Sequence, residues 1–223
     1  MYYALCQMPL PPDTSDNILY SESDGRELDN RAKSFAESCY RAIKEMGYLG
    51  AFDDASILDI GCGIGYLLSI LPGKHKLGID PNPLAKKYAR PGICVNCGTM
   101  ESVDGLFDIT MSWHVLEHVN DPPRFIKDMV EHTRIGGLIM IATPNADSIM
   151  AKSENWRCRE IFHRYLIGRR LLRSMMIDYG LVVEKELTWG GFPAPRKAWQ
   201  EIGNQVLKLF GHGDVQLVIA RKS

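Results

Sequence analysis

Short apolar runs alternate with amphipathic segments along the middle of the chain. Residues 26–46 carry apolar side chains at helical spacing, and two glycines follow this predicted helix. Beyond it come several short apolar runs, which are typical of buried strands and are separated by segments with helical spacing. The predicted strands are 56–60, 76–79, 93–96, 107–112 and 138–143, and the predicted helices between them are 66–71, 83–89 and 123–133. This order predicts βαβ units around a parallel sheet.

The alternation lapses after Pro144. A helix is predicted at 168–178, strands at 181–187 and 215–221, and an insertion containing Trp189 and Trp199 at 188–213. Together the patterns favour an α/β Rossmann-like three-layer sandwich, with a mostly parallel seven-stranded sheet and helices on both faces. The chain, residues 1–223, is interpreted as a single domain.

A glycine turn follows the first predicted strand of this sheet. Gly61, Gly63 and Gly65 lie directly after residues 56–60, and a helix follows them. Glycines at such a point let the backbone bend sharply and approach a ligand closely. Asp80 ends the next strand, where a carboxylate can accept the hydroxyl protons of an adenosine ribose. We expect the Asp80 side chain to bind the ligand rather than the core of the protein.

Two other nucleotide sites fit the glycine turn less well. The dinucleotide fingerprint needs a small residue at the position of Tyr66, where helix and strand pack closely. A phosphate-binding loop would need a lysine that this turn lacks. A glycine turn without any ligand is the remaining alternative.

Four segments in order resemble motifs of class I S-adenosylmethionine-dependent methyltransferases. They are Leu58 to Gly65, Gly78 to Pro81, Phe107 to Val119, and the residues around the last strand of this half, Gly136 to Leu138 and Thr143 to Asn145. The branch with the greatest resemblance includes small-molecule O-methyltransferases of ubiquinone biosynthesis. The resemblance spans roughly residues 56–145 and implies S-adenosylmethionine as cofactor, with S-adenosylhomocysteine as its product. It also implies a division of the single domain into a helical cap at 1–50, a cofactor half at 51–145 and a substrate side at 146–223.

The resemblance also implies roles for individual residues. Gly61 and Gly63 would contact the methionine part of the cofactor, and Asp59 its amino group. Asp80 would hold the ribose and Pro81 would pack against the adenine. The remaining expected contacts are Thr99, in place of the family's usual acidic residue, the backbone amide of Met100, and Ser112 and His114 facing the methionine end and the acceptor.

The residues from His114 to His118 also match the H-x-x-E-H pattern of a zinc peptidase class. Metal binding would want a sustained helix and a third ligand, whereas Pro122 and Pro123 follow closely. We therefore expect no metal, a structural role for His118, and His114 as the candidate catalytic base or acceptor contact. Cys94 and Cys97 are only half of a zinc site and are interpreted as partly buried thiols.

Arginines are concentrated on the substrate side. The formal net charge is −1, so bulk charge favours neither nucleic acid nor a membrane surface. An arginine run could be a solvated helix face or could pair with an anionic group of the acceptor. The run comprises Arg157, Arg159, Arg164, Arg169, Arg170 and Arg173.

These observations favour methyl transfer to the oxygen or nitrogen of a small or medium metabolite that could be anionic. RNA as acceptor, or a catalytically silent cofactor-binding module, stay as alternatives. The scattered cysteines, the absence of a signal pattern and the short apolar runs predict a cytoplasmic protein without a membrane span.

Overall fold

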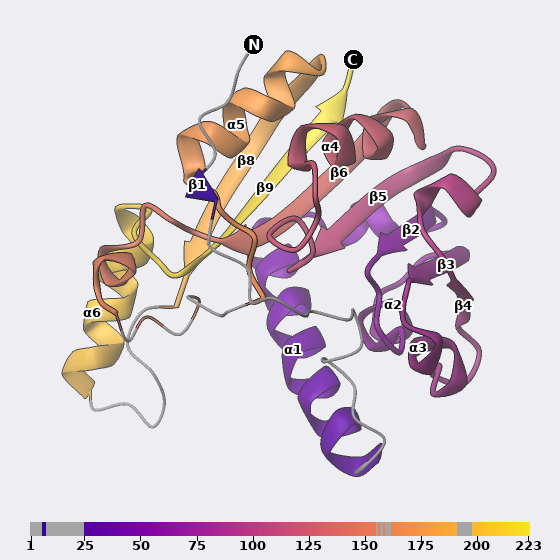
Figure 1. The fold of residues 1–223 in the computed structure, drawn as a ribbon, viewed down its shortest axis with the longest axis horizontal. Coiled ribbons are helices and arrows are strands. Elements are labelled where there is room, and N and C mark those ends of the chain that lie inside the picture. The colour runs from indigo at the N-terminus through magenta and orange to yellow at the C-terminus, as the bar shows by residue number, and fades with distance from the viewer. Residues whose placement is uncertain (1–5, 8–24, 155, 157, 159–161, 191–197) are drawn as a thin grey trace.

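The computed structural model describes residues 6–7, 25–154, 156, 158, 162–190 and 198–223. Within them a seven-stranded sheet has the order β4-β3-β2-β5-β6-β9-β8 (Figure 1). The strands are β2 (Ser56–Ile60), β3 (His75–Asp80), β4 (Cys94–Cys97), β5 (Phe107–Trp113), β6 (Thr133–Pro144), β8 (Leu181–Trp189) and β9 (Val215–Lys222). The pairs among β4, β3, β2, β5 and β6 are parallel, and β9 pairs antiparallel with both β6 and β8. The expected mostly parallel sheet is confirmed.

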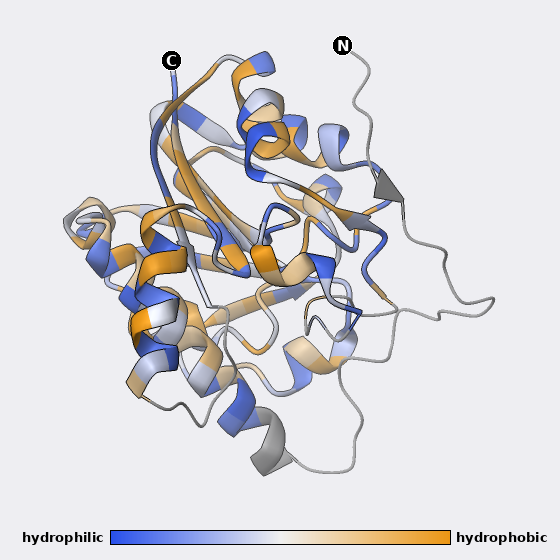
Figure 2. Cartoon of the chain, turned by 90° about the vertical axis from the view of Figure 1, so that its left-hand side faces the viewer, coloured by the Kyte–Doolittle hydropathy of each residue, from blue (hydrophilic) through white to orange (hydrophobic). Residues whose placement is uncertain are grey.

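Helices cover both faces of the sheet, because neighbouring residues of each strand point to opposite sides. On one face Ile57 and Met111 pack with Ile43 of α1 and Leu68 of α2. On the other, Leu58 joins a second core with α4 and α5. In Figure 2 the helices alternate between hydrophobic and hydrophilic colours, as expected when each buries one side. The helices are α1 (Gly25–Glu45), α2 (Tyr66–Ile70), α3 (Pro83–Lys87), α4 (Pro122–Glu131), α5 (Arg169–Asp178) and α6 (Ala198–Leu209).

Two elements differ from the sequence prediction. Residues 188–213 were expected as an insertion, but they contain α6, which packs against β8. The fifth predicted strand was expected at 138–143, whereas β6 already begins at Thr133 and includes Gly136 and Gly137. A Cβ on Gly137 would collide with the carbonyl oxygens of Asp108 and Arg134. Glycine is therefore needed for β6 to pack this closely against the neighbouring backbone.

The described residues also contain several short elements. β7 (Tyr165–Leu166) pairs antiparallel with β1 (Cys6–Gln7). Three short 3-10 helices lie at Leu49–Phe52, Met100–Ser102 and Ile149–Lys152. No helix among the described residues is long and apolar enough to cross a membrane.

Candidate functional site

The predicted site residues converge on one edge of the sheet. β2 lies between β3 and β5, so the strand order reverses there, which in open α/β sheets is where ligands bind. The register pairs Ile60 with Ile79 on one side and with Ser112 on the other, and Asp80 with Cys97. The ends of four strands therefore meet along one line, and each continues into a loop that carries predicted contacts.

The glycine turn is held close to both neighbouring strands. The backbone N–H groups of Gly61 and Cys62 donate to the carbonyl oxygen of Ile79, at 2.8 and 3.1 Å. Gly61 has a left-handed backbone with a φ of 72°, and a Cβ there would collide with the Val115 side chain. Only glycine fits this position, because any side chain would push the loop after β5 away from the turn.

Asp80 has a structural role as well as the predicted one. Its two carboxylate oxygens accept hydrogen bonds from the backbone N–H groups of Gly63 and Asn82, each at 2.9 Å. Burial raises the pKa of Asp80, and these two hydrogen bonds oppose that increase. The expectation that Asp80 serves the ligand alone was therefore wrong, because the same carboxylate fixes the glycine turn. Each carboxylate oxygen keeps a second lone pair, so a ribose can still be bound.

Asp59 is the least compensated charge at this edge. The side chain is 3% exposed, and no described residue forms a hydrogen bond or ion pair with its carboxylate. Burial and then the charge of Asp80 raise its pKa well above the usual range. A buried carboxylate without a partner is costly unless a cation or donor compensates it. Asp59 is thus well suited to accept a ligand ammonium group.

The remaining predicted contacts follow β3, β4 and β5. Pro81 directly follows Asp80, and its carbonyl oxygen accepts a weak hydrogen bond from the Cys97 thiol at 3.6 Å. Thr99 and Met100 begin the turn after β4, where Met100 is buried. Ser112 is fully buried at the end of β5, and its hydroxyl has no hydrogen-bond partner among the described residues. These placements agree with the predicted cofactor contacts, which stay predictions.

His114 lies where β5 leaves the sheet. It has a left-handed backbone with a φ of 55°, which is uncommon for a residue with a side chain. Its N–H donates to the carbonyl oxygen of Ala142 at 2.9 Å, and its ring packs edge-on against Phe35. The imidazole Nδ1 lies 3.1 Å from Oε1 of Glu117, and the His114 side chain is 28% exposed. His114 therefore connects a buried carboxylate to the surface of the site.

Glu117 and His118 of the H-x-x-E-H pattern form a cluster with His163, which sequence reasoning missed. Their possible ligand atoms lie within 4.8 Å of one another, and the rings of His118 and His163 meet edge to face at 4.8 Å. His118 Nδ1 lies 3.1 Å from the carbonyl oxygen of Phe162, and His163 Nδ1 lies 2.7 Å from that of Cys158. His163 is 45 residues from His118 in the chain, so spacing alone could not bring it here.

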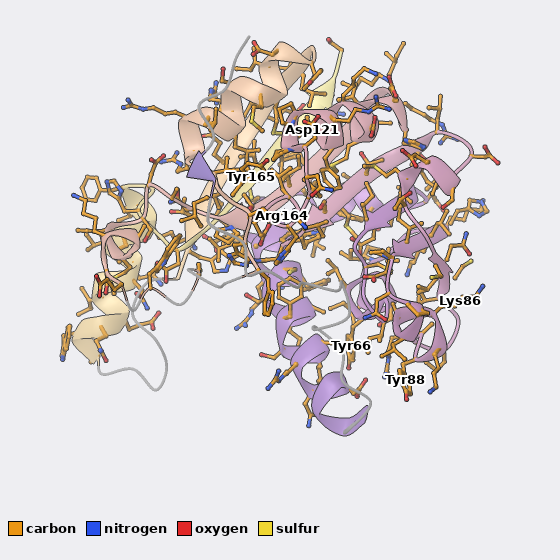
Figure 3. All side chains as sticks on the ribbon, viewed as in Figure 1. Tyr66, Lys86, Tyr88, Asp121, Arg164 and Tyr165 are labelled. Atoms are coloured by element: carbon orange, nitrogen blue, oxygen red, sulfur yellow. The ribbon has the colours of Figure 1, made fainter. Side chains whose placement is uncertain are left out.

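The described arginines of the run lie in different surroundings. Arg169 and Arg173 both pair with Glu186 of β8, each at 3.0 Å. Arg164 lies beside the site instead, because its backbone N–H donates to the carbonyl oxygen of Glu117 at 2.7 Å (Figure 3). Its guanidinium forms no ion pair with any described residue. Arg170 is exposed, and Arg157 and Arg159 lie outside the described residues.

This edge fits an adenosine cofactor with a charged amino acid end. The unpartnered Asp59 carboxylate suits the ammonium group, and Asp80 has lone pairs left for ribose hydroxyls. Glycines in the turn between them place no side chain over the backbone, which allows a ligand to approach it closely. Asp59, Gly61, Gly63, Asp80, Thr99 and Met100 are the residues that would hold it.

Comparison with known proteins gives the same family in three ways. A sequence profile described as "Methyltransferase domain" matches residues 31–186. A ubiquinone biosynthesis O-methyltransferase of Rhodopseudomonas palustris (strain BisB5) is 33% identical over 119 residues, covering 48% of this chain and 47% of the relative. An uncharacterised 37.1 kDa protein in transposon TN4556 of Streptomyces fradiae is 27% identical over 179 residues, or 70% of this chain and 51% of that protein. The chain thus spans about half the length of the curated relatives it matches.

Solved structures share the fold. A methyltransferase of Thermotoga maritima, described as a possible histamine N-methyltransferase, has a TM-score of 0.66 at 20% identity, covering 89% of this chain and 96% of that one. The N-methyltransferase NodS of Bradyrhizobium japonicum, solved with S-adenosyl-L-homocysteine, has a TM-score of 0.54 at 18% identity, covering 90% and 89%. With the profile matching well over half of its length, the chain belongs to the class I S-adenosylmethionine-dependent methyltransferases.

Proposed function

We propose that this chain transfers a methyl group from S-adenosylmethionine to an oxygen or nitrogen of a small or medium metabolite. The observation that carries the proposal is the pair of buried carboxylates, Asp59 and Asp80, on either side of the glycine turn. Asp59 has no cationic partner among the described residues, and Asp80 has lone pairs left over. These carboxylates suit the ammonium group and the ribose hydroxyls of this cofactor. The position at the edge where the strand order reverses supports the proposal, because ligands bind there in open α/β sheets.

In this chemistry the main task of the protein is to align the acceptor with the methyl group of the cofactor. The cofactor supplies a methyl group on a positively charged sulfur. Transfer is an in-line displacement in which the acceptor bonds to the methyl carbon as the carbon–sulfur bond breaks. Asp59 and Asp80 orient the cofactor, and the glycine turn and the loop after β5 exclude water. His114 is the candidate base for an acceptor that carries a proton.

The cofactor assignment is tested by thermal unfolding. Because binding to the native state alone stabilises it, S-adenosylhomocysteine at about 100 times its Kd should raise Tm by about 5 to 10 °C. NAD at the same concentration should leave Tm unchanged, since Tyr66 occupies the position where a dinucleotide site needs a small residue. A shift with NAD and none with S-adenosylhomocysteine would refute the assignment.

Small metabolites are favoured as acceptors by two kinds of observation. The names of similar proteins point to ubiquinone precursors and to histamine. In this chain Arg164, whose guanidinium has no described ion-pair partner, lies beside the loop that carries His114. Guanidinium pairs well with carboxylate or phosphate. An acceptor with both a hydroxyl or amine and an anionic group therefore suits this site.

A panel of acceptors tests this assignment by labelled-methyl transfer. We expect 3,4-dihydroxybenzoate to be a better acceptor than its neutral methyl ester, and Arg164→Gln should raise KM about tenfold for the acid only, which is the loss of one charge-assisted contact. The exposed Arg170→Gln is the matched control. An equal effect of Arg164→Gln on acid and ester would contradict the role of Arg164.

RNA is the second candidate acceptor, because arginines can also follow a phosphate backbone. The net charge of −1 and the pairing of Arg169 and Arg173 with Glu186 reduce the positive surface available for it. Total RNA in the same panel separates the two, since transfer to RNA would fall steeply between 50 and 200 mM salt, on the order of a thousandfold for six phosphate contacts. Tight binding of S-adenosylhomocysteine without transfer to any acceptor would instead favour a binding module.

A further inference from the structure

Glu117 is a buried residue held by two distant segments of the chain. Its side chain is fully buried, and Oε2 accepts a hydrogen bond from the Thr143 hydroxyl at the end of β6, at 2.9 Å. Its backbone carbonyl oxygen accepts from the N–H groups of Arg164 and Tyr165, at 2.7 and 3.2 Å. Two distant parts of the chain, the end of β6 and the segment that begins β7, therefore fix the position of this one residue.

The surroundings of Glu117 favour its charged form. Burial opposes ionisation, but the contact with His114 and the charges of His114, His118 and His163 outweigh it, so the pKa of Glu117 is lowered. An ionised carboxylate inside the protein is costly unless donors face it. The second oxygen, Oε1, has His114 Nδ1 at 3.1 Å but lacks a fully aligned hydrogen bond among the described residues. Such contacts commonly align only once a substrate is bound.

His114 is restrained on the other side. Its backbone conformation directs the chain out of β5, and Phe35 of α1 packs edge-on against its ring with centroids 5.5 Å apart. The ring can turn little between Phe35 and Glu117. Of the two ring nitrogens, Nδ1 faces the buried carboxylate.

We propose that Glu117 is a positioning residue that fixes the tautomer of His114. A carboxylate only accepts hydrogen bonds, so it holds the single proton of the neutral imidazole on Nδ1 and leaves the lone pair on Nε2. The inference rests on the proposed function, in which Nε2 takes the proton of the acceptor. The acceptor's electron pair then forms the bond to the methyl carbon, and the electrons of the carbon–sulfur bond remain on sulfur. Glu117 stabilises the imidazolium that results.

His118 and His163 complete the surroundings without taking the proton. Each has its Nδ1 within hydrogen-bond distance of a backbone carbonyl, and their charges add to that of His114 around Glu117. The two histidines and Glu117 are also residue types that bind metals. A metal would make Glu117 a ligand rather than the partner of His114, and the experiment separates these two roles.

The tautomer is measured first on the unaltered protein, by NMR of the histidine ring nitrogens, with His114→Ala to assign the signals. We expect His114 to carry its proton on Nδ1, and a proton on Nε2 in the neutral ring would overturn the proposal. This measurement needs neither an acceptor nor an active variant. Elemental analysis of the same sample should find no stoichiometric metal. A metal that is present in the unaltered protein and lost in Glu117→Gln would also overturn the positioning role.

Kinetics then separate positioning from a structural role. With 3,4-dihydroxybenzoate as acceptor, Glu117→Gln should lower kcat about a hundredfold, leave KM and S-adenosylhomocysteine binding within twofold, and move the acid limb of the pH profile of kcat to lower pH. The exposed Glu131→Gln of α4 is the matched control. An unchanged kcat and pH profile in folded Glu117→Gln refutes the inference, whereas failure of the unaltered protein to bind S-adenosylhomocysteine would refute the proposed function itself.

Discussion

The uncompensated Asp59 carboxylate should make the ligand-free protein less stable as pH rises. Its folded pKa is raised, so the native state holds the proton more tightly than the unfolded chain does. The stability it contributes is present below its unfolded pKa, about 3.9, and is lost as pH rises through the raised folded value. Asp59→Asn should therefore increase the free energy of unfolding at pH 7 by about 1 to 3 kcal/mol and change it little at pH 3.5.

Urea unfolding at both pH values, with Glu131→Gln as the exposed control, measures this effect of Asp59. The same substitution should abolish binding of S-adenosylhomocysteine, because it removes the charge that faces the ammonium group. A variant that is less stable than the unaltered protein at pH 7 would show that Asp59 has a favourable partner within the fold.

The left-handed backbone of His114 predicts a difference between two substitutions. Both His114→Gly and His114→Ala remove the imidazole and its contact with Phe35, but only alanine keeps the steric cost of a φ of 55°. That cost is about 1 kcal/mol, so the glycine variant should be the more stable by about that amount. Denaturant unfolding of the pair checks this prediction, and equal stabilities would mean that the backbone relaxes to another conformation.

The sequence predicts some site residues better than others for a local reason. Asp59 and the glycines lie within seven residues of one strand end, so the strand places them together whatever the rest of the chain does. The second role of Asp80 and the burial of Glu117 depend on contacts with other strands. The spacing of His114 and Glu117 was visible, but only the fold shows that the carboxylate faces inward.

At the scale of elements, α4 shows how one residue begins a helix. The Asp121 side chain accepts a hydrogen bond from the N–H of Arg124 at 3.0 Å, and Pro122 and Pro123 follow it (Figure 3). Asp121→Ala should lower the free energy of unfolding by about 1 kcal/mol, since it leaves that N–H without its partner. Asp121→Ser should recover most of the loss, because a hydroxyl can accept the same bond. Thermal unfolding of both variants measures this, and equal losses would contradict the capping role.

The strands and the helices between them were predicted because each has an apolar pattern of its own. The helix α6 was not predicted, although its apolar residues are periodic, because they do not form a core. Trp199, Ile202 and Leu209 are exposed, while Asn204 is its buried residue. Because the apolar residues of α6 do not mark a buried face, the sequence did not indicate how this segment packs. The segment was therefore interpreted as an insertion.

For the whole molecule, the cofactor half and the substrate side differ in how they are held together. The cofactor half consists of parallel strands, and each pairs with the strand before or after it in the sequence, except where β5 returns to pair with β2. The substrate side depends on contacts between distant residues. Asn145 donates to the carbonyl oxygens of Gly211 and Gly213, and Asp214 accepts from Ser148 and Trp156. Such contacts leave no periodic signal in the sequence, which is why they could not be predicted.

The position of β9 affects the order in which the protein assembles during translation. β9 lies between β6 and β8, although the ribosome makes β8 first. Strands β2 to β6 can pair with one another as they emerge, whereas β8 has no place in the sheet until Val215–Lys222 has left the exit tunnel. Until then Leu217 and Ile219, which pack in the core with α1, are missing, and the edge of β6 that pairs with β9 has no partner strand. The nascent chain therefore exposes a partly built sheet to chaperones and proteases for longer than its cofactor half alone would require.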